Sequence, residues 1–89
     1  MKIHPNFVLR EILGESMLVP LGEAATRFNG LISLNETGGA IVRYLQQDRT
    51  MEELTALITA EYDIDPATAQ GDIREYVDQL RQIGALVED

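Results

Sequence analysis

The spacing of apolar residues changes once along this chain, at Asn35. Before Asn35 the apolar residues form short runs separated by glycine and proline, whereas after it they recur every three or four positions. Short apolar runs bounded by such residues are typical of strands, and a spacing of three and four is that of amphipathic helices. The sequence therefore predicts an α+β fold, in which an N-terminal three-stranded antiparallel sheet is followed by a three-helix bundle.

The first two expected strands form a hairpin. Phe7–Leu13 and Ser16–Leu21 are apolar runs, and the Gly14-Glu15 spacer between them suits a tight turn. Pro20 has no N–H to donate to a ladder, so we expect the second strand to end there or to leave that position unpaired. Residues 21–27 fit a short strand and a helical turn equally well.

A third strand is expected over Phe28–Leu34. Because successive side chains of a strand point to opposite faces, one face would carry every second residue. One expected face holds Phe28, Gly30, Ile32 and Leu34, and the other holds Asn29, Leu31 and Ser33. No proline interrupts this run, so its backbone amides stay available for pairing.

The first expected helix begins after Asn35, a residue suited to capping. Its inward face is formed by Ile41, Val42, Tyr44 and Leu45. Gly38 and Gly39 fall in its first turns, where each glycine costs roughly 0.5 to 1 kcal/mol relative to alanine. No phosphate-binding glycine pattern follows a strand here. We therefore expect the two glycines to mark close packing of the helix backbone against the sheet.

Two further helices are marked by their caps. Thr50 and Glu53 have the spacing of a capping box, and this second helix should end near Tyr62. Asp65-Pro66 opens the third helix with a side-chain cap and a proline in the first turn, and Gly84 is placed to end it. The apolar stripe of the third helix is Ala69, Ile73, Tyr76, Val77, Leu80 and Ile83. Residues 85–87 are expected to pack back on the core as a short tail.

Composition argues for a binding protein and against an enzyme. At 89 residues the chain has room for one domain, residues 1–89, without a deep cleft. It has no cysteine and a single histidine, His4, in N-terminal residues that we expect to be mobile. A catalytic relay, a metal site and a redox centre are therefore not expected, and neither is a cofactor. Without a signal sequence or a membrane-spanning run, the protein is expected in the cytoplasm.

The formal charge of −8 restricts the possible partners. The chain has fifteen acidic residues and seven basic residues, and the basic residues are scattered singly along it. A nucleic-acid-binding protein usually displays a basic patch, and no patch is visible in this sequence. An acidic surface suits a basic or neutral partner.

Several segments together resemble the PqqD family. They are Leu34-Asn35-Glu36-Thr37-Gly38-Gly39, Leu45, Thr50, Glu53-Leu54 and Glu61-Tyr62-Asp63-Ile64-Asp65, together with the Phe7-to-Pro20 hairpin and the Phe28-to-Ile32 strand. They occur in the order and spacing of the family and extend over nearly the whole chain. The resemblance implies a winged-helix-like recognition element for ribosomally made, post-translationally modified peptides. Such a protein acts as a peptide chaperone.

The resemblance also implies a mechanism and a partner. The leader segment of a precursor peptide is held as an added strand on the third strand, in the cleft facing the third helix, and is presented to a modifying enzyme. That enzyme is often a radical S-adenosylmethionine protein, and the founding family member serves pyrroloquinoline quinone biosynthesis. The expected peptide-binding residues are Phe28, Asn29, Gly30, Leu31, Ile32 and Ser33 on the strand, the apolar Ile73, Tyr76, Val77 and Leu80 on the helix, and the polar Asp72, Arg74 and Gln79 beside them. We expect only two or three of the helix residues to touch a leader, since most of the stripe should be core.

Two other functions suit the same order of elements. A winged-helix nucleic-acid binder would need exposed basic residues on the third helix, which offers only Arg74 and Arg81. A dimerisation module would pair two copies through the same strand edge. The expected oligomeric state is a monomer or a weak homodimer.

Overall fold

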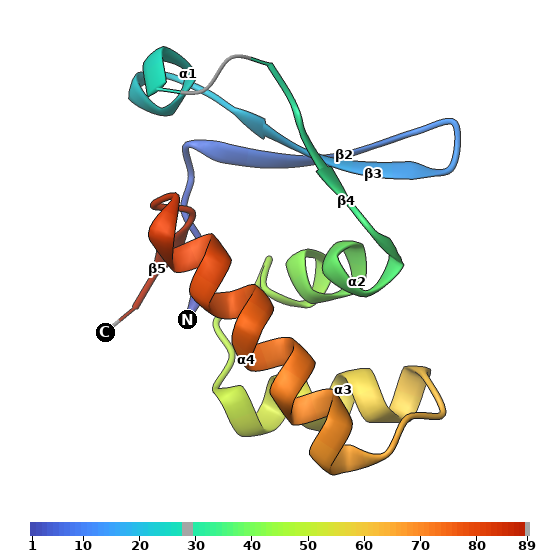
Figure 1. Cartoon of the computed structure of the whole chain (residues 1–89). Coiled ribbons are helices and arrows are strands. Elements are labelled where there is room, and N and C mark those ends of the chain that lie inside the picture. The colour runs from blue at the N-terminus through green and yellow to red at the C-terminus, as the bar shows by residue number, and fades with distance from the viewer. Residues whose placement is uncertain (28–29, 89) are drawn as a thin grey trace.

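Figure 1 shows a computed structural model of the chain, which describes residues 1–27 and 30–88. The strands are β1 (Lys2–Ile3), β2 (Phe7–Ile12), β3 (Glu15–Pro20), β4 (Ile32–Leu34) and β5 (Leu86–Val87), and the helices are α1 (Glu23–Arg27), α2 (Glu36–Tyr44), α3 (Met51–Glu61) and α4 (Pro66–Gln82). An antiparallel sheet has the order β2-β3-β4, and β1 pairs with β5. The α+β class and the three-stranded antiparallel sheet are confirmed.

The hairpin forms as expected, but its turn lies one residue earlier. Ile12 pairs with Glu15, so the two-residue loop is Leu13-Gly14 and Glu15 already belongs to β3. Both loop residues have positive φ, 54° at Leu13 and 81° at Gly14. Positive φ at both positions is the signature of a type I′ turn, whose twist matches that of the strands. As expected, β3 ends at Pro20.

The third strand is shorter than predicted. Only Ile32–Leu34 forms β4, and Gly30, with φ of 94°, turns the chain just before it. The predicted facing of side chains holds within the strand, since Leu34 is buried and Ser33 is exposed. Phe28 and Asn29 lie outside the described residues. The open choice over residues 21–27 resolves as a helix, α1, whose Ala24 is fully buried.

All three predicted helix caps are present. The Asn35 side chain accepts from the N–H of Gly38 at 2.7 Å, and Asp65 accepts from the N–H of Thr68 at 3.2 Å. Thr50 and Glu53 form the reciprocal capping box, at 2.9 and 3.1 Å. Each bond satisfies an N–H that has no partner within its own helix. Gly84, at φ of 76°, follows the end of α4 in the left-handed conformation.

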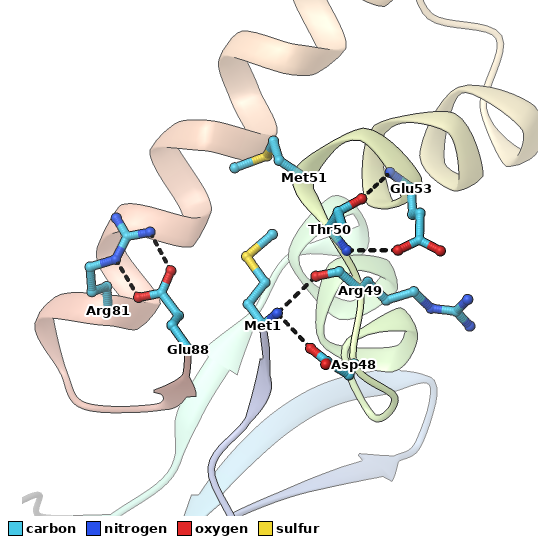
Figure 2. A pocket seen from close by; sticks show the side chains of 8 residues that line it. All are labelled: Met1, Asp48, Arg49, Thr50, Met51, Glu53, Arg81 and Glu88. Atoms are coloured by element: carbon cyan, nitrogen blue, oxygen red, sulfur yellow. Dashed lines mark hydrogen bonds and ion pairs between the residues drawn. The ribbon is translucent and has the colours of Figure 1, made fainter.

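The N-terminal residues are tied down, contrary to expectation. The Met1 ammonium lies 2.7 Å from an Asp48 carboxylate oxygen (Figure 2), and the N–H of Ile3 donates to the Leu45 carbonyl at 2.9 Å. β1 then pairs with β5, the tail that follows α4. Figure 1 accordingly shows β5 close to the N-terminus. The pairing joins residues more than 80 positions apart, so no local pattern indicated it.

The core lies between the sheet and the helices. α2 contacts β3, β4 and α3, and α3 packs on α4 (Figure 1). The most deeply buried side chains of the described residues are Leu18, Ile41, Val42, Leu45, Leu54, Ile58, Ile73 and Val77. Full burial of such a side chain stabilises the fold by about 1.5 to 3 kcal/mol. In this part of the chain no polar or charged residue is buried, and no helix is long and apolar enough to cross a membrane.

Candidate functional site

β4 is an edge strand of the sheet. One side of it pairs with β3, through Ser16–Leu34, Met17–Ser33 and Leu18–Ile32. Within residues 1–27 and 30–88 no strand pairs with its other side. An edge strand presents unpaired backbone N–H and C=O groups, on which another extended chain can form hydrogen bonds. The segment before Asn35 therefore provides the open sheet edge that strand addition requires.

A hollow of about 390 Å³ lies next to the end of this strand. Its lining comes from the start of α2 and from one face of α4, and consists of Asn35, Thr37, Asp72, Glu75, Tyr76 and Gln79. The four α4 residues are spaced by three, four and seven positions, so they share one helix face. Asn35 directly follows β4 in the chain. The hollow thus lies between α4 and the start of α2, directly after β4 in the chain.

The wall of the hollow is acidic, with one aromatic group. Asp72 and Glu75 are exposed, and no basic residue is among the lining residues of the described chain. Tyr76 is half-buried, and this burial raises the pKa of its phenol above the ordinary value of 10. Among the described residues, its hydroxyl makes no hydrogen bond. The hollow therefore offers a guest two carboxylates and one hydroxyl that has no hydrogen-bond partner in the described part of the chain.

Tyr76 owes its position to a glycine on the neighbouring helix. A Cβ built on Gly38 of α2 would lie 2.1 Å from the Tyr76 Oη and 2.3 Å from its Cζ. The ring therefore lies directly on the α2 backbone. Gly39, next in the chain, approaches Ser16 of β3 in the same way, with 2.8 Å from its built Cβ to Oγ. The expected close packing is confirmed for Gly39 against the sheet, whereas Gly38 packs against α4.

The sequence profile of the family described as "Coenzyme PQQ synthesis protein D (PqqD)" matches residues 15–86. The chain belongs to the PqqD family. No curated protein matches it.

Two solved structures share the fold of this PqqD-family chain. One is described as "TbiB1 in Complex with the TbiA(beta) Leader Peptide"; it is 27% identical, has a TM-score of 0.79, and the match covers 100% of both chains. The other is described as "Lasso peptide synthetase B1 complexed with the leader peptide", with 21% identity, a TM-score of 0.75, and coverage of 98% of this chain and 96% of that one. Each of these two proteins binds a leader peptide.

The structure divides the predicted α4 residues into three groups. Asp72, Tyr76 and Gln79 line the hollow. Ile73, Val77 and Leu80 are core residues, with exposed fractions of 0, 0 and 2%, in line with the expectation that most of the stripe is core. Arg74 is exposed but does not line the hollow. It lies two positions, or about 200°, around the helix from Asp72.

The predicted strand residues lie at or near the free edge. Ile32 and Ser33 belong to β4, while Gly30 and Leu31 precede it and are exposed. Phe28 and Asn29, as noted, fall outside the described residues. Of the described residues in the predicted strand, Ile32–Leu34 form β4.

Sequence reasoning missed three residues of the hollow, Asn35, Thr37 and Glu75. Asn35 and Thr37 were assigned only to the helix start and to the family motif. Glu75 stands three positions after Asp72, so the helical period alone would have placed it on the same face. The sequence signal for these α4 residues is a second stripe at helical spacing, Asp72, Glu75 and Gln79, which runs beside the core stripe of the same helix.

A second hollow, of about 400 Å³, lies beside Arg81 near the C-terminal end of α4 and is shown in Figure 2. Its charged groups pair with one another, since the Met1 ammonium meets Asp48 at 2.7 Å and Arg81 meets Glu88 at 2.8 Å. Arg81 also pairs with Asp78. Thr50 and Glu53, which also line this hollow, bond to each other in the capping box. These groups are already satisfied, so this hollow offers little to a ligand.

No group of three or more potential metal ligands occurs in the described part of the chain. The free edge of β4 and the hollow between α2 and α4 are features that an added peptide strand could use.

Proposed function

We propose that this protein binds the leader segment of a ribosomally made precursor peptide as an extra strand on β4. The single observation that carries the proposal is the free β4 edge next to the hollow on α4. In strand addition, backbone hydrogen bonds give affinity and pockets for alternate side chains give specificity. The edge supplies the first requirement and the hollow supplies the second.

The comparisons support the same proposal. The PqqD-family profile extends over residues 15–86, which include β3, β4 and α4. A structure that matches this chain over its whole length, at 27% identity, is a complex with a leader peptide. We therefore propose that the ligand class is shared, while the precursor of this protein is its own.

The charges of the hollow restrict the leader. Asp72 and Glu75 stand in its wall without a basic neighbour in the lining. A carboxylate brought close to them would be repelled, whereas a Lys or Arg side chain would be attracted, with a strength that falls as salt rises. We propose a leader that places a basic or neutral side chain in the hollow.

The proposed role is recognition and delivery, without catalysis by this chain. The leader would be held while a separate modifying enzyme acts on the remainder of the precursor. The identity of that enzyme, including the radical S-adenosylmethionine protein suggested by the resemblance, stays a prediction.

No observation favours the nucleic-acid alternative. Of the two arginines on α4, Arg81 is already engaged by Asp78 and Glu88. Arg74 is left as a single exposed basic residue on a helix that also carries Asp72, Glu75 and Asp78. A duplex would approach a helix whose exposed charge is mainly negative, and phosphate repels such a surface.

Amide chemical shifts test the proposal. The labelled protein is titrated with leader peptides of candidate precursors, beginning with the TbiA(beta) leader that the 27% identical structure holds. We expect the largest shifts at Leu31, Ile32 and Ser33, together with Asp72 and Tyr76. Shifts confined to the Figure 2 hollow, or to the hairpin loop, would contradict strand addition on β4. Sedimentation of the same samples detects self-pairing, because a dimer held through this edge would dissociate as leader is added.

A further inference from the structure

Gly38 and Tyr76 form a contact that allows no other residue at position 38 without movement. The built Cβ lies 2.1 Å from Oη, 2.3 Å from Cζ and 2.8 Å from Cε2 of the ring. Real Cβ atoms essentially never approach other atoms closer than 3.0 Å. The three atoms belong to one rigid ring, so no small adjustment of a flexible chain end relieves the overlap. Any side chain at position 38 therefore displaces the whole phenol.

The displaced ring borders a hollow. The phenol lies against the α2 backbone at Gly38, and Tyr76 also lines the hollow of about 390 Å³. Movement of the ring into that space would bring it between Asn35 and Thr37 at the start of α2 and Asp72 and Glu75 on α4. The hollow would be filled by the protein's own side chain.

Gly38 and Gly39 have the same cost as helical glycines, but different contacts compensate for it. A glycine inside a helix loses roughly 0.5 to 1 kcal/mol relative to alanine. For Gly39 the compensation is the close approach of α2 to Ser16 of β3, which is structural. For Gly38 the compensation is the seat of Tyr76, whose hydroxyl has no hydrogen bond among the described residues. Gly38 thus sets the position of a ring that lines the hollow.

We propose that Gly38 is a positioning residue that keeps the guest cleft open by seating the Tyr76 ring against α2. This inference rests on the proposed function, because the cleft is the one that would receive a leader side chain. Gly38 acts only through Tyr76, so its effect must vanish when the ring is absent.

A double-mutant cycle measures this dependence. Gly38→Ala is expected to weaken leader binding at least tenfold, because the ring then occupies the hollow. Tyr76→Ala removes the ring, and with it any contact of Tyr76 with the leader. When Gly38→Ala is added to Tyr76→Ala, the affinity for the leader should change less than twofold. Gly71→Ala is the matched control. It is the same substitution on α4, with nothing within 4 Å of the built Cβ, and should leave affinity unchanged.

A second readout needs no leader. With ¹³C-labelled tyrosine, the phenol of Tyr76 is titrated in the free protein, where burial raises its pKa. Gly38→Ala should move the ring resonances and change the titration of the phenol, whereas Gly71→Ala should change neither. If Gly38→Ala prevents folding, the double variant with Tyr76→Ala must fold, since it lacks the clash.

The outcomes separate the two proposals. Unchanged ring resonances in Gly38→Ala, or full leader affinity despite a displaced ring, would overturn the positioning role. Equal losses from Gly38→Ala with and without the Tyr76 ring would overturn it too. Failure of the unaltered protein to bind any leader, with the ring still displaced in Gly38→Ala, would refute the proposed function while leaving the Gly38–Tyr76 contact established.

Discussion

The β2–β3 turn places a leucine where leucine is unfavourable. Leu13 has φ of 54° and is 99% exposed, so it combines a left-handed backbone with a side chain that packs against nothing. The left-handed conformation costs an ordinary residue roughly 1 to 2 kcal/mol, and asparagine followed by glycine is a preferred pair for this turn. Leu13→Asn loses no buried surface. It should therefore increase the free energy of unfolding by about 1 kcal/mol.

The assay is thermal and urea unfolding of the two proteins side by side. For a domain of this size, 1 kcal/mol corresponds to an increase in Tm of roughly 4 to 8 °C. The urea midpoint should rise while the slope of the transition stays constant. Gly14→Ala is a control for which the opposite change in Tm is expected. At φ of 81° with no atom within 4 Å of the built Cβ, alanine introduces backbone strain and no clash, and should lower the Tm.

A lower Tm for Leu13→Asn would refute the reasoning. So would changes of the same sign for both substitutions, because the loop conformation requires them to differ. Either result would mean that the turn is not of type I′ or that Leu13 is packed.

Three further predictions concern the fold and its pH dependence. Thr50→Ala breaks the capping box with Glu53 and should cost about 0.5 to 2 kcal/mol in urea unfolding, with no gain elsewhere to offset it. Ile73→Ala empties a fully buried position and should cost about 2 to 5 kcal/mol, which is a direct check that this residue is core and not an exposed leader contact. The Tyr44 hydroxyl, which donates to Glu61 at 2.7 Å, helps to hold the pKa of Glu61 below 4.5. The resulting stabilisation is present above pH 4.5 and is lost as pH falls through the pKa of Glu61 in the folded protein. The difference in unfolding free energy between Glu61→Gln and the unaltered protein should therefore shrink on acidification. A difference that grows instead would contradict this sign.

The features that could be predicted from the sequence are those made by neighbours in the chain. The caps at Asn35, Thr50 and Asp65 each join a side chain to a backbone group three residues away, so spacing alone revealed them. The apolar period likewise fixed the buried stripe of α4. In such cases the local preference and the final packing agree.

The features that could not be predicted depend on distant partners. The β1–β5 pairing joins the two ends of the chain, and neither two-residue strand has a pattern of its own. At position 38 the cost of a helical glycine was visible, but its partner Tyr76 lies on another helix, so packing was assigned to the sheet instead. The predicted set of residues around the hollow was incomplete for the same reason, because Asn35 and Thr37 come close to α4 only in the folded chain.

The central claim is that the free edge of β4 pairs with the backbone of a leader peptide. The most direct measurement is the affinity of a set of leader peptides, each methylated at one backbone nitrogen, because N-methylation removes one N–H and leaves the side chains and the protein unchanged. Since alternate residues of an added strand direct their N–H toward the sheet, we expect methylation to weaken binding strongly at every second position and weakly between them. A uniform or irregular response along the bound segment would contradict strand addition.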